Sequence, residues 1–175
     1  IGLASSSRLR YQSSVLSFLE WLNETQNENF EVNKYKFRIS KNINLPDILS
    51  IDEVNNMINS YDSKTLMGIR NSLIVELLYS TACRVTELCE LKLSDIDYDQ
   101  KTIKILGKGK KTRIVPLGTY LTNKLDEYLF HRSKVKTSIP YLILSKSNKK
   151  IDRTAVFRVI KKSAISMGMN SDIHP

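Results

Sequence analysis

Two segments of the sequence combine residues that could act together on a phosphate group. In residues 78–88 (LYSTACRVTEL), Arg84 is followed three positions later by Glu87, beside an apolar run. At helical spacing the two share a face, so the carboxylate can hold the guanidinium while its outer N–H groups face an oxyanion. In residues 107–117 (GKGKKTRIVPL), Lys108 lies in a basic turn between two strand-like segments. This pair suits phosphoryl transfer on a nucleic acid, because the arginine can bind the phosphate while the lysine protonates the leaving oxygen.

Each of these residues also has a simpler interpretation. Arg84 could form a buried ion pair with Glu87 and have no other role. Lys108 could be a solvated turn lysine, which is the common fate of lysine in a glycine-containing hairpin. Lys110 and Lys111 are neighbouring candidates for its role.

The charge of the chain is positive and unevenly distributed. The 175 residues carry a net charge of +9, and residues 101–117 hold six basic residues and no acid. Residues 146–162 hold seven basic residues against one aspartate, and residues 34–41 add four more. These clusters could be ordinary solvated surface, but three separate ones favour a polyanionic partner, and nucleic acid is the expected class.

The composition also argues against several other classes of protein. With 41% hydrophobic residues the chain is expected to be globular, and it has no apolar run near the roughly 18 residues of a membrane span. Its two cysteines, Cys83 and Cys89, are expected on one helix, too far apart to bridge and therefore reduced. No His or Cys spacing suggests a metal site, and we expect no metal and no cofactor. These features predict a cytoplasmic, nucleoid-associated protein.

The pattern of apolar residues predicts a mostly helical α+β fold around a small antiparallel sheet. A helix is expected over residues 5–22, with the serines at 5–7 as N-caps, followed by a polar connection over 23–44. Ser50 and Glu53 form a capping box, with Leu49 and Val54 as its hydrophobic staple, which predicts a new folding unit. Further helices are expected near 51–60, 65–80, around Arg84, at 119–132 and at 152–167. Strands are expected at 95–99, 102–106 and 112–117, with an extended piece at 141–144.

Several motifs in the same order resemble the tyrosine recombinase (phage integrase) family, in particular its Xer-type branch. They lie at residues 49–54 (LSIDEV), 70–73 (RNSL), 78–88, 91–97 (LKLSDID) and 107–117. The resemblance implies the last part of a helical core-binding domain at 1–30, a linker at 31–46 and the first part of a catalytic domain at 47–175. It also implies a tetrameric assembly of recombinase protomers on DNA.

The resemblance assigns roles to individual residues. Arg84 matches the catalytic arginine that contacts the scissile phosphate, Lys108 matches the hairpin lysine that acts as general acid, and Glu87 matches the acidic residue that supports the arginine. Ala82 stands where the family usually has glycine. We expect further DNA contacts from exposed basic residues of the hairpin and of the last helix, namely Lys110, Lys111, Arg113, Arg153, Arg158 and Lys161. Those of the last helix could instead serve solubility alone.

The last residues, 171–175 (SDIHP), resemble the lead-in to the family's His-x-Leu-Arg-His box. His174 lies two positions before the place of the catalytic histidine and is not assigned that role. The box and the tyrosine nucleophile are not matched within the 175 residues, so we expect these residues to be an internal piece of a recombinase and inactive by themselves. An alternative is an inert DNA-binding or regulatory protein that kept the same scaffold.

Overall fold

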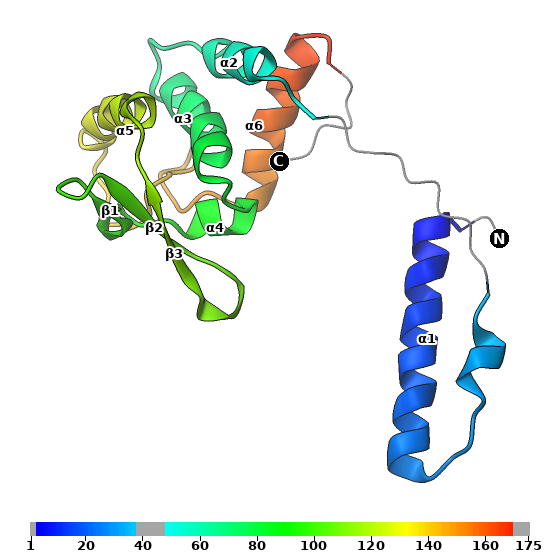
Figure 1. The fold of residues 1–175 in the computed structure, drawn as a ribbon. Helices are drawn as coiled ribbons and strands as arrows, with labels where there is room; N and C mark the ends of the chain where they lie inside the picture. Colours follow the sequence, from blue (N-terminus) through cyan, green and yellow to red (C-terminus); the bar gives the residue numbers. More distant parts are fainter. Residues whose placement is uncertain (1–2, 38–47, 170–175) are drawn as a thin grey trace. The chain divides into compact units, whose positions relative to one another are not determined.

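The computed structural model describes residues 3–37 and 48–169, which fall into two compact units, Ile1–Pro46 and Asp47–Pro175 (Figure 1). The first unit contains the helix α1 (Ser5–Gln26) and a short 3-10 helix (Val32–Tyr35). The Asn23 side chain ties α1 to the segment just before the 3-10 helix, because its Nδ2 donates to the Phe30 carbonyl at 2.9 Å while its Oδ1 accepts the Phe30 amide at 2.8 Å. None of the residues of α1 is buried.

The structure corrects three expectations for this first unit. Ala4 is the N-cap of α1, so the serines at 5–7 lie inside the helix rather than capping it. The helix ends at Gln26 instead of residue 22, because Asn27 adopts the left-handed conformation that terminates helices (φ 56°). Residues 23–26 are therefore helical, not part of a polar connection, and the rest of that expected connection lies partly outside the described residues.

The second unit begins with the helix α2 (Ile51–Asn59), and its predicted start is confirmed. The Ser50 Oγ accepts the Glu53 amide at 3.2 Å, and the Glu53 carboxylate accepts the Ser50 amide at 2.7 Å. Leu49 packs on the cluster that contains the buried Val54, as a hydrophobic staple does. The capping box fixes where the chain enters this unit.

The helix α3 (Leu66–Thr81) is the central element of this unit and packs against both α2 and α5 (Thr119–Arg132) (Figure 1). The Thr65 side chain caps α3 by accepting the Gly68 amide at 3.1 Å. Most residues of α3 are buried, and they include polar side chains such as Arg70 and Glu76 as well as apolar ones, so the helix is covered on more than one face. The main core joins α3 to the sheet and to the other helices through Leu73, Leu77, Leu88, Ile103, Ile105, Leu121, Leu125 and Val156.

The sheet has three antiparallel strands in the order β1 (Ile96–Asp97), β2 (Thr102–Leu106) and β3 (Thr112–Pro116). The hairpin of β2 and β3 confirms the prediction, whereas β1 is shorter than the expected 95–99. The Asp95 carboxylate accepts the Lys92 amide at 2.8 Å in a 3-10 turn, and the Asp97 carboxylate accepts the Gln100 amide at 2.8 Å. These aspartates hold turns on both sides of β1 and so limit its length.

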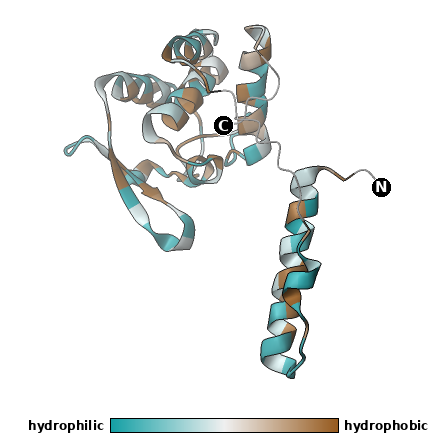
Figure 2. Ribbon diagram, turned by 45° about the vertical axis from the view of Figure 1, so that its right-hand side comes forward, coloured by the Kyte–Doolittle hydropathy of each residue, from teal (hydrophilic) through white to brown (hydrophobic). Residues whose placement is uncertain are grey.

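The remaining helices are α4 (Val85–Glu90) and α6 (Arg153–Ser166). Asp152 caps α6 by accepting the Ala155 amide at 2.7 Å. At the other end Gly168 has φ 70°, and the Met169 amide donates to the Ala164 carbonyl at 3.0 Å, which is a Schellman motif. Both predicted ends of α6 are therefore confirmed. Figure 2 shows the hydrophilic residues of the second unit concentrated at the far end of the β2–β3 hairpin and on outer helix surfaces.

Cys83 and Cys89 were expected on one helix, but Cys83 lies before the start of α4 and only Cys89 is in that helix. Both are buried and free. Burial raises the pKa of the Cys89 thiol to about 11, and burial also raises the pKa of Cys83. They behave as small apolar core residues.

A backbone feature at the end of α3 generates a stability prediction. Ala82 follows the helix with φ 46° and ψ 35°, in the left-handed region, and its side chain is exposed. The left-handed conformation costs an alanine about 1–2 kcal/mol in the folded state, and a glycine does not pay this cost. Glycine also makes the unfolded chain more flexible, which lowers the free energy of unfolding by roughly 0.4–1 kcal/mol. Ala82→Gly should therefore raise the free energy of unfolding by about 0.5–1 kcal/mol in denaturant titrations.

The matched control for this prediction is Ala155→Gly, which places glycine inside the first turn of α6. It should lower the free energy of unfolding by about 0.5–1 kcal/mol. If both glycine variants destabilise the protein, the left-handed backbone at Ala82 is not strained.

Candidate functional site

Arg84 and Glu87 meet at the N-terminus of α4. Arg84 is the N-cap residue, outside the helix, and its Nη1 donates to Glu87 Oε1 at 2.9 Å. Glu87 Oε2 also accepts the backbone amide of Arg84 at 3.0 Å. The expected pairing at a spacing of three residues is present, although the two residues share a helix start and not a helix face.

The two partners differ sharply in exposure. The Glu87 side chain is 5% exposed, whereas the Arg84 side chain is 70% exposed. Arg84 is therefore not a buried ion-pair residue, which corrects the simpler interpretation. A buried carboxylate holds one side of the guanidinium, and the other N–H groups face solvent. This geometry can receive an oxyanion.

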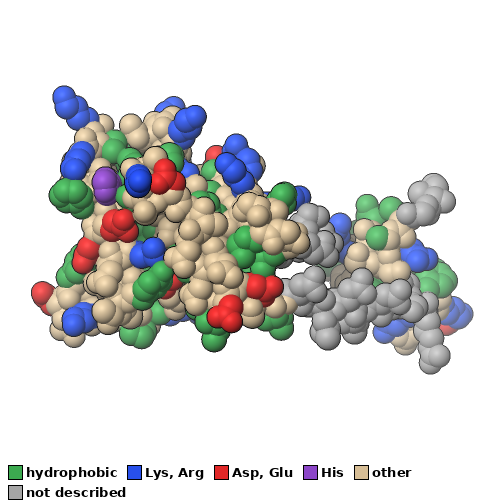
Figure 3. Space-filling view, turned by 90° about the horizontal axis from the view of Figure 1, so that it is seen from above, with side chains coloured by type: hydrophobic (Ala, Val, Ile, Leu, Met, Phe, Trp, Pro, Cys, Tyr) green, Lys and Arg blue, Asp and Glu red, His purple; other side chains and the backbone are tan. Residues whose placement is uncertain are grey.

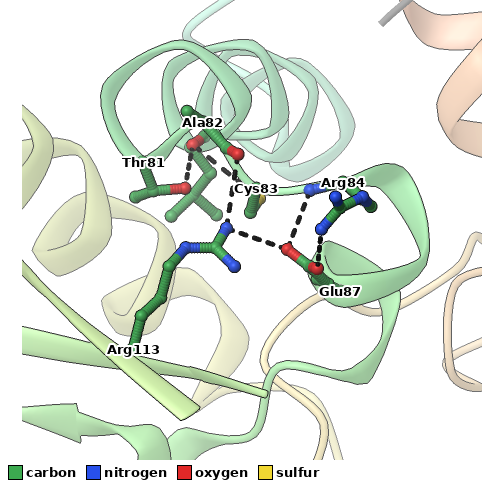
Figure 4. A network of polar contacts seen from close by, with 7 residues as sticks. Thr81, Ala82, Cys83, Arg84, Glu87 and Arg113 are labelled. Atoms are coloured by element: carbon green, nitrogen blue, oxygen red, sulfur yellow. Dashed lines mark hydrogen bonds and ion pairs between the residues drawn. The ribbon is translucent and has the colours of Figure 1, made fainter. Parts of the chain in front are cut away.

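Arg113, which lies on β3, also binds Glu87. Its Nη2 donates to Glu87 Oε2 at 2.8 Å and to the Ala82 carbonyl at 3.3 Å (Figure 4). Its side chain is 38% exposed. From the sequence, Arg113 was expected to contact DNA, and its contact with Glu87 was not predicted.

One signal in the sequence could have placed Arg113 on the inner face of the hairpin. Along β3 the exposed residues alternate with the half-buried Arg113 and Val115, and Arg113 pairs with the fully buried Ile105 across the sheet. Strand periodicity thus turns Arg113 toward the covered side. The identity of its partner, 26 residues earlier in the chain, follows only from the tertiary structure.

The three contacts set the charge state of Glu87. Burial by itself would raise its pKa, but the hydrogen bonds from Arg113 and from the backbone and side chain of Arg84 together lower the pKa to about 2. Glu87 is therefore a carboxylate at neutral pH. One negative charge lies between two guanidinium groups, which leaves the cluster with net positive charge.

The β2–β3 hairpin places Lys108 beside this cluster. A methyl group on Gly107 would lie 3.5 Å from Glu87 Oε1 and 3.7 Å from Arg113 Nη1, so the backbone at this glycine packs against the carboxylate. Lys108 is the next residue, it is exposed, and it starts the 3-10 turn Lys108–Lys110. Gly109 has φ 73°, a left-handed conformation for which glycine is suited. The structure thus brings the hairpin lysine and the Arg84–Glu87 pair to one region.

The other predicted DNA-contacting residues are exposed but do not join this cluster. Lys110 and Lys111 lie on the same turn as Lys108, where the Lys111 carbonyl accepts the Gly107 amide at 2.8 Å, and Arg153, Arg158 and Lys161 are exposed on α6. The face of the second unit drawn in Figure 3 carries both basic and acidic side chains.

Two buried arginines were not assigned a role from the sequence. Arg132 ties α5 to the following loop, donating to the carbonyls of Ile139, Tyr141 and Leu142 at 2.8–3.1 Å. Arg70 donates to the Leu144 carbonyl at 3.0 Å and to the Asn71 side chain, and burial lowers its pKa. Arg70 lies at an open cleft of about 650 Å³ whose lining also includes Lys146, Asp152, Arg158 and Lys162.

Within residues 3–37 and 48–169, no group of three or more His, Cys, Asp or Glu side chains could hold a metal ion. None of the helices described there is long and apolar enough to cross a membrane. The chemistry available from the described cluster is that of Arg84, Glu87, Arg113 and Lys108.

Comparisons with known proteins show the family to which the chain is similar. The Phage integrase family matches residues 47–175. A tyrosine recombinase XerD of Listeria innocua is 29% identical over 180 residues, covering 99% of this chain and 60% of the relative. A crystal structure of the XerH site-specific recombinase bound to its difH substrate has a TM-score of 0.72 at 22% identity, covering 97% of this chain and 50% of that one. A lambda integrase dimer bound to a COC′ core site has a TM-score of 0.71 at 21% identity, with coverages of 95% and 60%.

The position of Glu87 between two guanidiniums generates a prediction for the pH dependence of stability. Its folded pKa of about 2 lies below the ordinary value of 4.5, so Glu87 contributes stability above pH 4.5 that is lost as the pH falls toward 2. Glu87→Gln should be less stable than the wild type at pH 7, and the difference should shrink between pH 4.5 and pH 2. Urea unfolding of both proteins across this range measures it. A difference that stays constant down to pH 2 would contradict the ion-paired state of Glu87.

Proposed function

The chain belongs to the phage integrase family, and from that premise we propose that its protein is a Xer-type site-specific DNA recombinase. The chain spans about 60% of the length of the XerD relative that it matches. The family resemblance implies the chemistry, in which a tyrosine hydroxyl attacks the scissile phosphate and forms a 3′-phosphotyrosine bond while the 5′ oxygen leaves. The 5′ hydroxyl of a partner strand then attacks this bond and releases the tyrosine.

One observation carries the proposal, namely the exposed guanidinium of Arg84 held by the buried Glu87 beside the hairpin of Lys108. We assign Arg84 to the scissile phosphate, where its outer N–H groups would stabilise the charge that develops in the transition state. Glu87 fixes the guanidinium and takes no part in proton transfer. Lys108 is assigned as the general acid that protonates the leaving 5′ oxygen.

Double-stranded DNA and other recombinase protomers are the proposed partners. Both the XerH and the lambda integrase structures contain DNA, and the latter is a dimer. We assign residues 1–30 to the end of a core-binding domain, 31–46 to a linker and 47–175 to the first part of the catalytic domain. Exposed basic residues of the hairpin and of α6 are proposed to contact the phosphate backbone, namely Lys110, Lys111, Arg153, Arg158 and Lys161.

The 175 residues should bind duplex DNA weakly and with strong salt dependence, because the basic clusters are proposed to contact phosphates and not bases. Replacing Lys161 by glutamate should reduce the slope of log K against log salt by about 1 or more. Lys136→Glu, an equal charge change at an exposed position after α5, is the matched control and should change the slope less. Titration of a fluorescent duplex at several salt concentrations measures both. Binding that is insensitive to salt would count against the DNA partner.

The same 175 residues should form no covalent adduct with DNA. The proposed mechanism needs a tyrosine beyond a His-x-x-Arg box, and no His-x-x-Arg sequence occurs in these residues. A nicked suicide duplex run on a denaturing gel would reveal an adduct. An adduct that disappears when one of the eight tyrosines is replaced would show that the nucleophile is already present.

In the full-length protein, Lys108→Ala should slow cleavage by about 100-fold or more, as expected for loss of a general acid. A 5′-bridging phosphorothioate substrate should restore the rate, because a thiolate leaves without a proton. Lys110→Ala, on the same turn, is the control. If the phosphorothioate restores cleavage by Lys110→Ala instead, Lys110 is the general acid. If it restores cleavage by neither variant, the hairpin only binds phosphate.

A further inference from the structure

Glu87 divides its two carboxylate oxygens between two arginines from different elements. Oε1 accepts Arg84 Nη1 at 2.9 Å, while Oε2 accepts Arg113 Nη2 at 2.8 Å and the Arg84 amide at 3.0 Å. The exposed Arg84 side chain approaches the carboxylate from the solvent side. The less exposed Arg113 approaches it from β3 (Figure 4). The orientation of the carboxylate that holds Arg84 therefore depends on Arg113.

The same nitrogen of Arg113 also reaches the end of α3. Its Nη2 donates to the carbonyl of Ala82 at 3.3 Å, and this carbonyl belongs to the residue in the left-handed conformation. One guanidinium thereby ties together the end of α3, the start of α4 and the strand β3. The segment between these helices, which carries Arg84, is fixed at both of its ends.

Arg113 also lies at the base of the turn that carries Lys108. It pairs with Ile105 across the hairpin, and one pair further toward the turn, beyond Leu106 and Thr112, the Gly107 amide donates to the Lys111 carbonyl at 2.8 Å. A methyl group on Gly107 would come within 3.7 Å of Arg113 Nη1. A shift of Arg113 would therefore move both the carboxylate that holds Arg84 and the backbone next to Lys108.

We propose that Arg113 is a positioning residue that sets Arg84 and Lys108 in one fixed geometry, acting through Glu87 and through the hairpin. The inference rests on the proposed function of those two residues. It assigns to Arg113 a role different from the DNA-backbone contact expected from the sequence. In this arrangement the bridging nitrogen of Arg113 is committed to protein acceptors, and its loss should affect the rate of the reaction more than the affinity for DNA.

The first experiment uses the 175-residue chain without DNA. Arg113→Met removes the guanidinium and keeps an unbranched apolar side chain like the arginine stem, and Lys104→Met removes a charge from the exposed face of β2 as a matched control. In Arg113→Met, NMR should show a higher titration midpoint for the Glu87 carboxylate and a more mobile Arg84 side chain. The Gly107 amide, which donates to the Lys111 carbonyl, should exchange about tenfold faster or more, as expected for loss of a charge-assisted hydrogen bond nearby.

Lys104→Met should leave these three signals as in the wild type. Arg113→Lys, which keeps the charge but lacks the planar fork, should give intermediate values and serves if Arg113→Met does not fold. If Arg113→Lys and Arg113→Met both leave the Glu87 titration and the hairpin exchange unchanged, the positioning role is overturned whatever the function of the protein.

The second experiment measures single-turnover DNA cleavage by the full-length protein. Arg113→Met should cleave roughly 10- to 100-fold more slowly, as displacement of a reacting group does, with less than a threefold change in Kd for DNA. A wild type that does not cleave would refute the proposed function, and the DNA-free experiment would still decide the role of Arg113. Normal cleavage by Arg113→Met with weakened DNA binding would show a DNA contact and overturn the inference.

Discussion

The interaction on which the site depends is the ionised carboxylate of Glu87, 5% exposed and bound by two guanidinium groups. An uncompensated charge at this depth would be costly, so the carboxylate requires its hydrogen bonds. The exposed Arg84 and the backbone amide at the start of α4 supply two of them, and Arg113 supplies the third from β3. The cluster that results is positive and faces solvent at Arg84, which suits a phosphate.

The surrounding fold serves to bring these groups together from three parts of the chain. The core of α3, the sheet and α5 fixes where α3 ends, and the left-handed Ala82 there directs its carbonyl to Arg113. The β2–β3 hairpin brings the backbone of Gly107 against Glu87, and Lys108 is the next residue along the hairpin. No single element contains the site, and its geometry therefore depends on how these elements pack.

Local rules explain which features could be predicted from the sequence. The capping box at Ser50, the cap at Asp152, the Gly168 terminus and the β2–β3 hairpin each depend on neighbouring residues, and all were predicted. The Arg84–Glu87 pair was predicted for the same reason. The Arg113–Glu87 contact was missed because it joins residues 26 positions apart, and strand β1 was predicted too long because aspartate side chains favour turns beside it.

The central claim is that Arg84, held by Glu87, binds the scissile phosphate, and one measurement tests it most directly. Cleavage by the full-length protein and by its Arg84→Ala variant should be compared on one suicide substrate, with DNA affinity measured in parallel. The account predicts that the variant forms no covalent protein–DNA adduct while its Kd rises only modestly, because one phosphate contact among many contributes little to affinity and much to the transition state. Normal cleavage by Arg84→Ala would show that the Arg84–Glu87 pair is structural only and would contradict the account.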